Sequence, residues 1–160
     1  MAYTLNQFHN VFKTFAQNHR FVNSYGFGDL ADIGNGVENY SVNKDNSTGK
    51  LMYPSMWITP QPSVIDRHFI RWKFNILFYD LVHKDDSNSI EVLSDTQQCA
   101  ADLINYLRNP SYEDYFSIDN EYSFQITPFR DRFNDEVTGW MLDLEIDVVN
   151  LNDRCTIPIA

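Results

Sequence analysis

The sequence predicts an α+β domain spanning residues 1–160, with an antiparallel or mixed sheet of about four to six strands. Two amphipathic helices are expected to pack on one face of this sheet. Three observations lead to this fold class: a long alternating stretch at 69–82, a second one at 140–148, and two segments with helical apolar spacing. A chain of this length suits one domain, because folding at this size buries roughly 70% of the surface that the unfolded chain exposes.

The stretch 69–82 is the longest strict two-residue alternation in the chain. Apolar side chains stand at Ile70, Trp72, Phe74, Ile76, Phe78 and Val82, and polar ones stand between them at Arg71, Lys73 and Asn75. Successive side chains of a strand point to opposite faces of the sheet. The stretch is therefore predicted to be a long strand buried on one side only.

The stretch 140–148 has the same pattern with the opposite charge. Its apolar residues alternate with Asp143, Glu145 and Asp147. Opposite charges facing each other across neighbouring strands contribute roughly 0.2–1 kcal/mol per pair, and like charges cost about as much. We therefore predict that 69–82 and 140–148 share a sheet with their charged rows on one face, which is left to water or to partners.

Both helices are predicted from apolar spacing together with capping boxes. Thr4 and Gln7 form the first box, and phenylalanines at helical spacing then extend a helix from about Leu5 to Asn18, with His9 and His19 on its polar face. The second box is at 94–97, and its helix ends at Asn109-Pro110.

The remaining segments are predicted to be short strands and turns. Strands are expected at 29–33, 37–42, 51–58 and 122–127, and exposed or turn segments at 43–50, 59–63, 83–89, 111–120, 129–139 and 150–160. Proline decides several of these limits, because it lacks the N–H that a central strand requires. Pro54 is expected to confine 51–58 to an edge or a bulge, the Pro60/Pro62 pair to form a turn, and Pro128 to end a strand.

Composition excludes several classes of function. The net charge is −10, and residues 80–121 carry ten acids against Lys84 and Arg108, whereas residues 1–28 carry Lys13, Arg20 and no acid. Stable nucleic-acid binding needs clustered Lys and Arg, so it is disfavoured. The two cysteines, Cys99 and Cys155, have no neighbours at zinc spacing, and we expect free thiols with no metal or cofactor.

No apolar run approaches the ~20 residues that cross a bilayer, and the first 17 residues lack the pattern of a secretory signal. We therefore expect a soluble chain made in the cytoplasm, without a membrane partner.

Three segments carry a family resemblance. The sequences YPSMWITP at 53–60, YDLV at 79–82 and RFNDEVTGW at 132–140, in this order of elements, resemble the tail-terminator or neck proteins of tailed bacteriophages. The sequences of these segments are most similar to those of homologues from crAss-like phages. The resemblance implies a structural virion protein of the neck or tail, assembled in the host cytoplasm, that forms a hexameric or dodecameric ring in the head–tail connector.

The same resemblance implies the partners. The ring would contact copies of itself and portal, adaptor or other neck and tail proteins, and DNA would pass through it without sequence-specific binding. An acidic lining would repel phosphates and let the duplex slide. The family brings no catalytic residues.

We predict that charged side chains make the contacts between subunits. A ring needs one subunit's front to meet the next one's back, and a basic first helix against the acidic 80–121 region is one such pairing. The candidate interface residues are Lys13, Arg20, Arg71, Lys73, Arg130, Arg132, Asp135, Glu136, Asp143 and Glu145.

Two other functions compete with a ring protein. An enzyme would need a nucleophile beside a base, paired carboxylates or a metal set, and no sequence signature of these is present, so we expect no catalysis. The alternative is a cytoplasmic peptide- or protein-binding module that uses the 51–63 stretch and the exposed face of the sheet.

Overall fold

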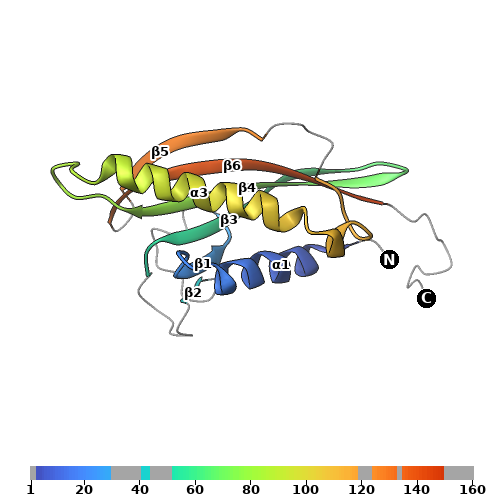
Figure 1. Cartoon of the computed structure of the whole chain (residues 1–160). Helices are drawn as coiled ribbons and strands as arrows, with labels where there is room; N and C mark the ends of the chain where they lie inside the picture. Colours follow the sequence, from blue (N-terminus) through green and yellow to red (C-terminus); the bar gives the residue numbers. More distant parts are fainter. Residues whose placement is uncertain (1–2, 30–40, 44–51, 119–123, 133–134, 150–160) are drawn as a thin grey trace.

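Two helices cover one face of a mixed six-stranded sheet, which confirms the predicted fold class (Figure 1). The structure, a computed structural model, describes residues 3–29, 41–43, 52–118, 124–132 and 135–149. In chain order the elements are α1 (Leu5–Asn18), β1 (Ser24–Phe27), β2 (Ser41–Asn43), β3 (Ser55–Ile65), β4 (Phe69–Leu81), α3 (Ser89–Leu107), the 3₁₀ turn η1 (Pro110–Tyr112), β5 (Ile126–Arg132) and β6 (Glu136–Val149).

The strand order in the sheet is β2-β1-β3-β4-β6-β5. Only β1 and β3 run parallel, and every other neighbouring pair is antiparallel. All of β4 pairs with β6, from Phe69 opposite Val149 to Leu81 opposite Val137. The two stretches that alternate in the sequence are thus neighbours at the centre of the sheet.

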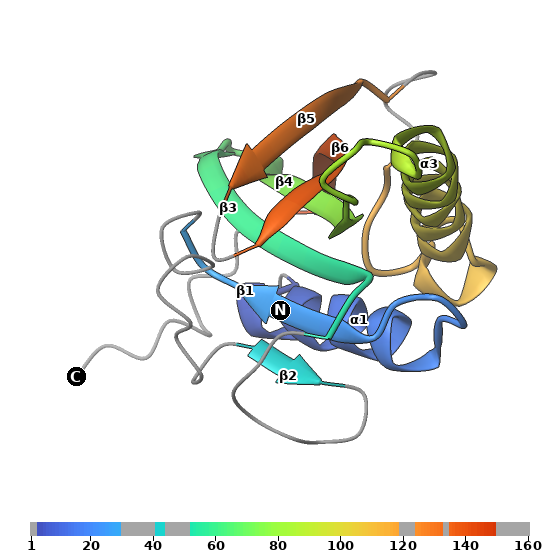
Figure 2. The same cartoon turned by 90° about the vertical axis from the view of Figure 1, so that its left-hand side faces the viewer.

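The helical layer and the sheet enclose the main core. Helix α1 begins with the predicted capping box, in which the Thr4 N–H donates to the Gln7 Oε1 at 2.7 Å. Its Phe8 and Phe12 rings lie edge-on to Phe74 of β4, at 5.8 and 5.3 Å between ring centroids. Figure 2 shows both helices on the same side of the sheet. The two-residue and 3.6-residue periods thus predict the apolar face that the sheet and the helices share.

Helix α3 begins six residues earlier than the second capping box indicates, at Ser89 instead of residue 95. It starts at Ser89, so Ser94 lies inside the helix and caps nothing. The buried Val92 extends the apolar stripe upstream, and the Thr96 hydroxyl donates to the Val92 carbonyl at 2.7 Å. The residue at the N-cap, Asn88, instead holds the preceding loop, accepting from the His83 N–H at 2.8 Å.

The expectations drawn from proline were wrong for an identifiable reason. Residues 59–63 are part of β3 and not a turn, and β5 continues through Pro128 to Arg132. Pro128 is tolerated because β5 is the last strand of the sheet, where a missing N–H costs no ladder bond. Pro54 lies just before β3, which is an internal strand over 55–58.

Several predicted segments lie outside the described residues. These are most of the 29–33 and 37–42 strands, the 43–50 tip, the first part of the 122–127 strand and the 150–160 tail.

The second face of the sheet is not wholly wet, which corrects the sequence prediction. At one end it carries a second apolar cluster of Trp57, Leu77, Tyr79 and Val137, all at most 3% exposed. The Trp57 Nε1 donates to the Gly28 carbonyl at 3.0 Å, and the ring lies where a side chain at Gly26 would otherwise stand. The charged row occupies the other part of this face.

Gly139 is required by the close approach of β6 to β4. A Cβ at this position would overlap the Phe78 carbonyl oxygen and lie 2.8 Å from the Tyr79 Cα, both of which are backbone atoms of the central strand. We predict that Gly139→Ala lowers the free energy of unfolding by about 1–3 kcal/mol, measured by urea denaturation. Gln97→Ala, on the exposed face of α3, is the control and should change it by less than about 0.5 kcal/mol. An unchanged unfolding midpoint for Gly139→Ala would contradict this packing.

Candidate interaction surface

Residues 59–73 form a hairpin that extends past the helical layer, and we call it the β3–β4 arm. Strand β1 pairs with β3 only over Ser55–Ile58, so within the described chain the outer half of β3 pairs with β4 alone. Residues 62–68 are all exposed. In Figure 1 the arm continues beyond the ends of α1 and α3. The outer part of the arm, residues 62–68, is therefore exposed, whereas at its base Thr59 is buried and the Trp72 ring packs on Phe8 of α1.

The open edge of the arm is protected against pairing with another strand. The Ile58 carbonyl accepts from the Gly28 N–H on the β1 side, and alternation directs the Pro60 backbone to the same side, where it has no N–H to donate. Between Gln61 and Val64 the register shifts at a β-bulge, and the Ser63 Oγ accepts from the Lys73 N–H at 3.1 Å. Prolines and bulges at an edge prevent strand addition. Contacts with a partner must therefore come from the side chains.

Next to its polar turn at 66–68, the arm carries one exposed aliphatic side chain on each face. Ile65 is 77% exposed and Val64 is 48% exposed, and alternation sends them to opposite sides of the hairpin. Val149, at the end of β6 and opposite Phe69, is 65% exposed. Large aliphatic side chains gathered at a projecting tip indicate a contact surface, whereas isolated ones are common on any protein.

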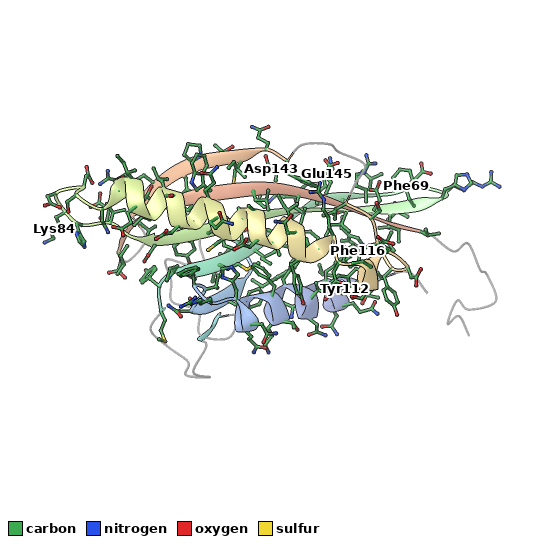
Figure 3. The ribbon with its side chains drawn as sticks, in the orientation of Figure 1. Phe69, Lys84, Tyr112, Phe116, Asp143 and Glu145 are labelled. Carbon is green, nitrogen blue, oxygen red and sulfur yellow. The ribbon has the colours of Figure 1, made fainter. Side chains whose placement is uncertain are left out.

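A ladder of ion pairs crosses the arm's base on the face away from the helices. The Arg71 Nε and Nη2 donate to the two carboxylate oxygens of Asp147 at 2.7 and 2.9 Å. The Lys73 Nζ lies 3.1 Å from a Glu145 oxygen. Figure 3 places Asp143 and Glu145 on this face, opposite the helices. The prediction that the two charged rows share a face is confirmed. These charges bind each other within one chain, as the expected cross-strand pairing requires.

The other predicted interface residues are dispersed over the molecule. Arg130 of β5 binds Asp86 and Glu136, so it ties β5 to the loop before α3. Asp135 accepts a hydrogen bond from the Tyr53 hydroxyl at 3.0 Å. Asp143 stands opposite Asn75 on β4. Lys13 lies half-buried on α1, Arg20 is exposed just after it, and Arg132 ends β5. The candidates therefore come from several different elements of the fold.

The sequence predicts His9 and His19 on the polar face of the first helix. In the structure both side chains instead contact other parts of the body. The His9 ring packs edge-on against Tyr25 and Phe27, and burial lowers its pKa, with Lys13 adding to the effect. The His19 Nε2 lies 3.1 Å from an Asp102 oxygen on α3. His19 therefore joins the two helices.

The described chain contains no cluster of three or more His, Cys, Asp or Glu side chains arranged to hold a metal ion. Cys99 is a free thiol inside the core, and burial, aided by Asp102 and Asp95, raises its pKa to about 12. Neither α1 nor α3 nor any other helix within the described ranges is both long and apolar enough to cross a membrane.

Sequence reasoning missed the arm because it assigned the Pro60/Pro62 segment to a turn. The residues after Pro62 do indicate a hairpin. Two β-branched residues, Val64 and Ile65, precede the polar run 66–68, and the long alternation begins directly after it. A polar run between two β-rich segments is typical of a hairpin. The Asp66 N–H indeed donates to the Phe69 carbonyl at 2.8 Å across that turn.

No protein-family model, curated protein or solved structure matches this chain. The resemblance to phage neck proteins therefore remains a prediction from the sequence.

The ion-pair ladder predicts an unequal coupling at its two rungs. The side chains of Arg71 and Asp147 are 35% and 15% exposed, and two hydrogen bonds join them. The side chains of Lys73 and Glu145 are 40% and 31% exposed, and one nitrogen–oxygen contact joins them. Double-mutant cycles with Arg71→Ala and Asp147→Ala, read by urea denaturation, should give a coupling near 1 kcal/mol, and the Lys73/Glu145 cycle about half of that or less. Equal couplings, or none at Arg71, would contradict the assigned geometry.

Proposed function

We propose that this chain is a structural virion protein that forms a ring in the head–tail connector of a tailed phage, as a neck or tail-terminator component. One observation carries the proposal: the β3–β4 arm projects from the body with an exposed apolar tip and an edge closed to strand pairing. Such an arm is suited to side-chain contacts with another folded subunit. The three segments that resemble neck proteins add to this support.

The charge of the chain is compatible with a DNA conduit. With a net charge of −10, a ring of six or twelve copies would carry a strongly negative total charge. DNA phosphates would be repelled from an acidic lumen, and the duplex could slide without binding. The proposed partners are copies of the chain and portal, adaptor or other neck and tail proteins. The ring would assemble in the host cytoplasm and function in the virion.

The peptide-binding alternative receives less support from the arrangement of β3. Ser55–Thr59, the centre of the 51–63 stretch, is buried inside the sheet and is not accessible to a ligand. Exposed positions in that stretch are Met52 and the arm residues Pro60, Pro62 and Ser63. A peptide would therefore meet the same arm that the ring proposal uses.

The mass of the assembled protein tests the proposal. We expect the purified chain to give closed rings of six or twelve subunits by native mass spectrometry and negative-stain electron microscopy, either alone at high concentration or on addition of the portal and adaptor proteins. A chain that stays monomeric with all of these proteins, and that instead binds a peptide or converts a small molecule, would refute a ring function.

A further inference from the structure

Four polar side chains form one row across the face of the sheet that lies away from the helices. Thr59, Asn75 and Asp143 stand directly opposite one another on β3, β4 and β6. Gln125 completes the row next to Asp143, whose N–H donates to the Gln125 carbonyl at 3.1 Å. We call these four residues the polar row. It lies between the ion-pair ladder and the second apolar cluster, the one that contains Trp57.

The side chains of the polar row have no partners within the described part of the chain. The Thr59 hydroxyl oxygen is buried without a hydrogen bond, in a residue that is only 9% exposed. Among the described residues, the side chains of Asn75, Asp143 and Gln125 make no hydrogen bond or ion pair either. A buried hydroxyl that lacks a partner destabilises the folded chain. The row therefore lacks contacts that another molecule could supply.

The polar row also contains the acid of β6 that the ion-pair ladder leaves without a cation. Glu145 and Asp147 bind the two cations of β4. At the next rung the residue opposite Asp143 is the neutral Asn75. Three acids and two cations therefore face this side on β4 and β6, a balance of −1. A cationic side chain from outside would extend the ladder by one rung.

A guanidinium suits the polar row better than a metal ion does. It is planar, with five N–H donors in a fixed fork, and it can bind a carboxylate through two of them. The Asp143 carboxylate lies between the side-chain amides of Asn75 and Gln125, whose oxygens are further acceptors. With its oxygen bound, the Asn75 amide can donate an N–H to the Thr59 hydroxyl opposite it. A metal ion would find only one carboxylate in the row.

One arginine of the chain is available to bind the row. Arg20 is exposed just after α1, and within the described ranges it makes no ion pair or hydrogen bond. The other arginines with described side chains interact within their own chain; these are Arg67, Arg71, Arg108 and Arg130. The sheet separates α1 from the polar row (Figure 2), so Arg20 can meet the row only on another copy. Beside Arg20, the Phe21 side chain is 54% exposed.

We propose that Arg20 of one copy places its guanidinium on Asp143 and Asn75 of the next. Phe21 then packs on Met141, which is partly exposed two residues before Asp143 on the same face. Arginine and aromatic side chains are typical anchors of protein interfaces. The proposal rests on the ring function and specifies one of its subunit contacts. Because it joins the helix side of one copy to the opposite side of the next, the contact can repeat around a ring.

Exchange of the two charges tests the contact. Arg20→Asp and Asp143→Arg each bring like charges together, so each should raise the protein concentration needed for ring formation by more than about tenfold, measured by analytical ultracentrifugation. The double variant Arg20→Asp/Asp143→Arg restores opposite charges and should regain most of the assembly. Lys84→Asp, at an exposed cation before α3, changes the net charge as Arg20→Asp does. It is the control and should assemble like the unchanged chain.

Circular dichroism and the urea midpoint show whether each variant is folded. Any variant that loses its fold is replaced by Arg20→Gln or Asp143→Asn, which keep the side-chain size, and the two losses of assembly should then be coupled and not additive.

The outcomes separate this contact from the ring function itself. If both single variants form rings as readily as the control, the ring function stands and the contact is wrong. If the single variants fail and the double variant does not recover, the two residues do not face each other, and the contact is also wrong. A loss of assembly in Lys84→Asp as large as that in Arg20→Asp would trace the effect to net charge and overturn the contact. An unchanged chain that forms no ring, alone or with the portal and adaptor, would overturn both.

Discussion

The pairing of β4 with β6 is the constraint on which the rest of the structure depends. The two strands are in register along the whole of β4, and both alternate with a period of two. Each therefore has one largely apolar row, which includes Phe74 and Leu144, and the two rows form a single apolar surface on the helix side that ends at the pair Asp80 and Thr138. Shifting the register by one residue would turn one of the two strands over, and would bring either Arg71 and Lys73 of β4 or the three carboxylates of β6 into the core. The ion pairs on the outer face reinforce the same register.

The two helices cover the apolar surface of the sheet, and the arm extends beyond that cover. Helices α1 and α3 cover the apolar surface only along part of β4, so the first residues of the strand, with their partner β3, continue beyond the helical layer. Continuing a hairpin past its own core costs backbone entropy that few buried contacts offset. The prolines and the bulge in β3 protect this exposed edge, and the apolar tip remains available to a partner.

The sequence predicts the sheet and the helices well because these depend on periodicity. The charged rows of 69–82 and 140–148 were assigned to one face from alternation alone, and pairs such as Lys73 and Glu145 meet as expected. Prolines were less informative about where strands end. Pro60, Pro62 and Pro128 predict strand breaks, yet each lies where no neighbouring strand needs its N–H. The place of a strand in the sheet is a tertiary property, and a proline tolerated at an edge cannot be recognised before that place is known.

The candidate surface was predicted only in part. The ten charged interface residues stay a prediction, and three of them, Arg71, Lys73 and Arg130, bind acids of their own chain. The exposed residues Ile65 and Ile90 were missed, because exposure is not visible in a pattern. The central claim, that the arm tip contacts another copy, is tested most directly by a photo-crosslinking amino acid at position 65. Crosslinked products should have the mass of two or more subunits, and peptide mapping should place the links between position 65 and another subunit. Links confined to the same chain would contradict the account.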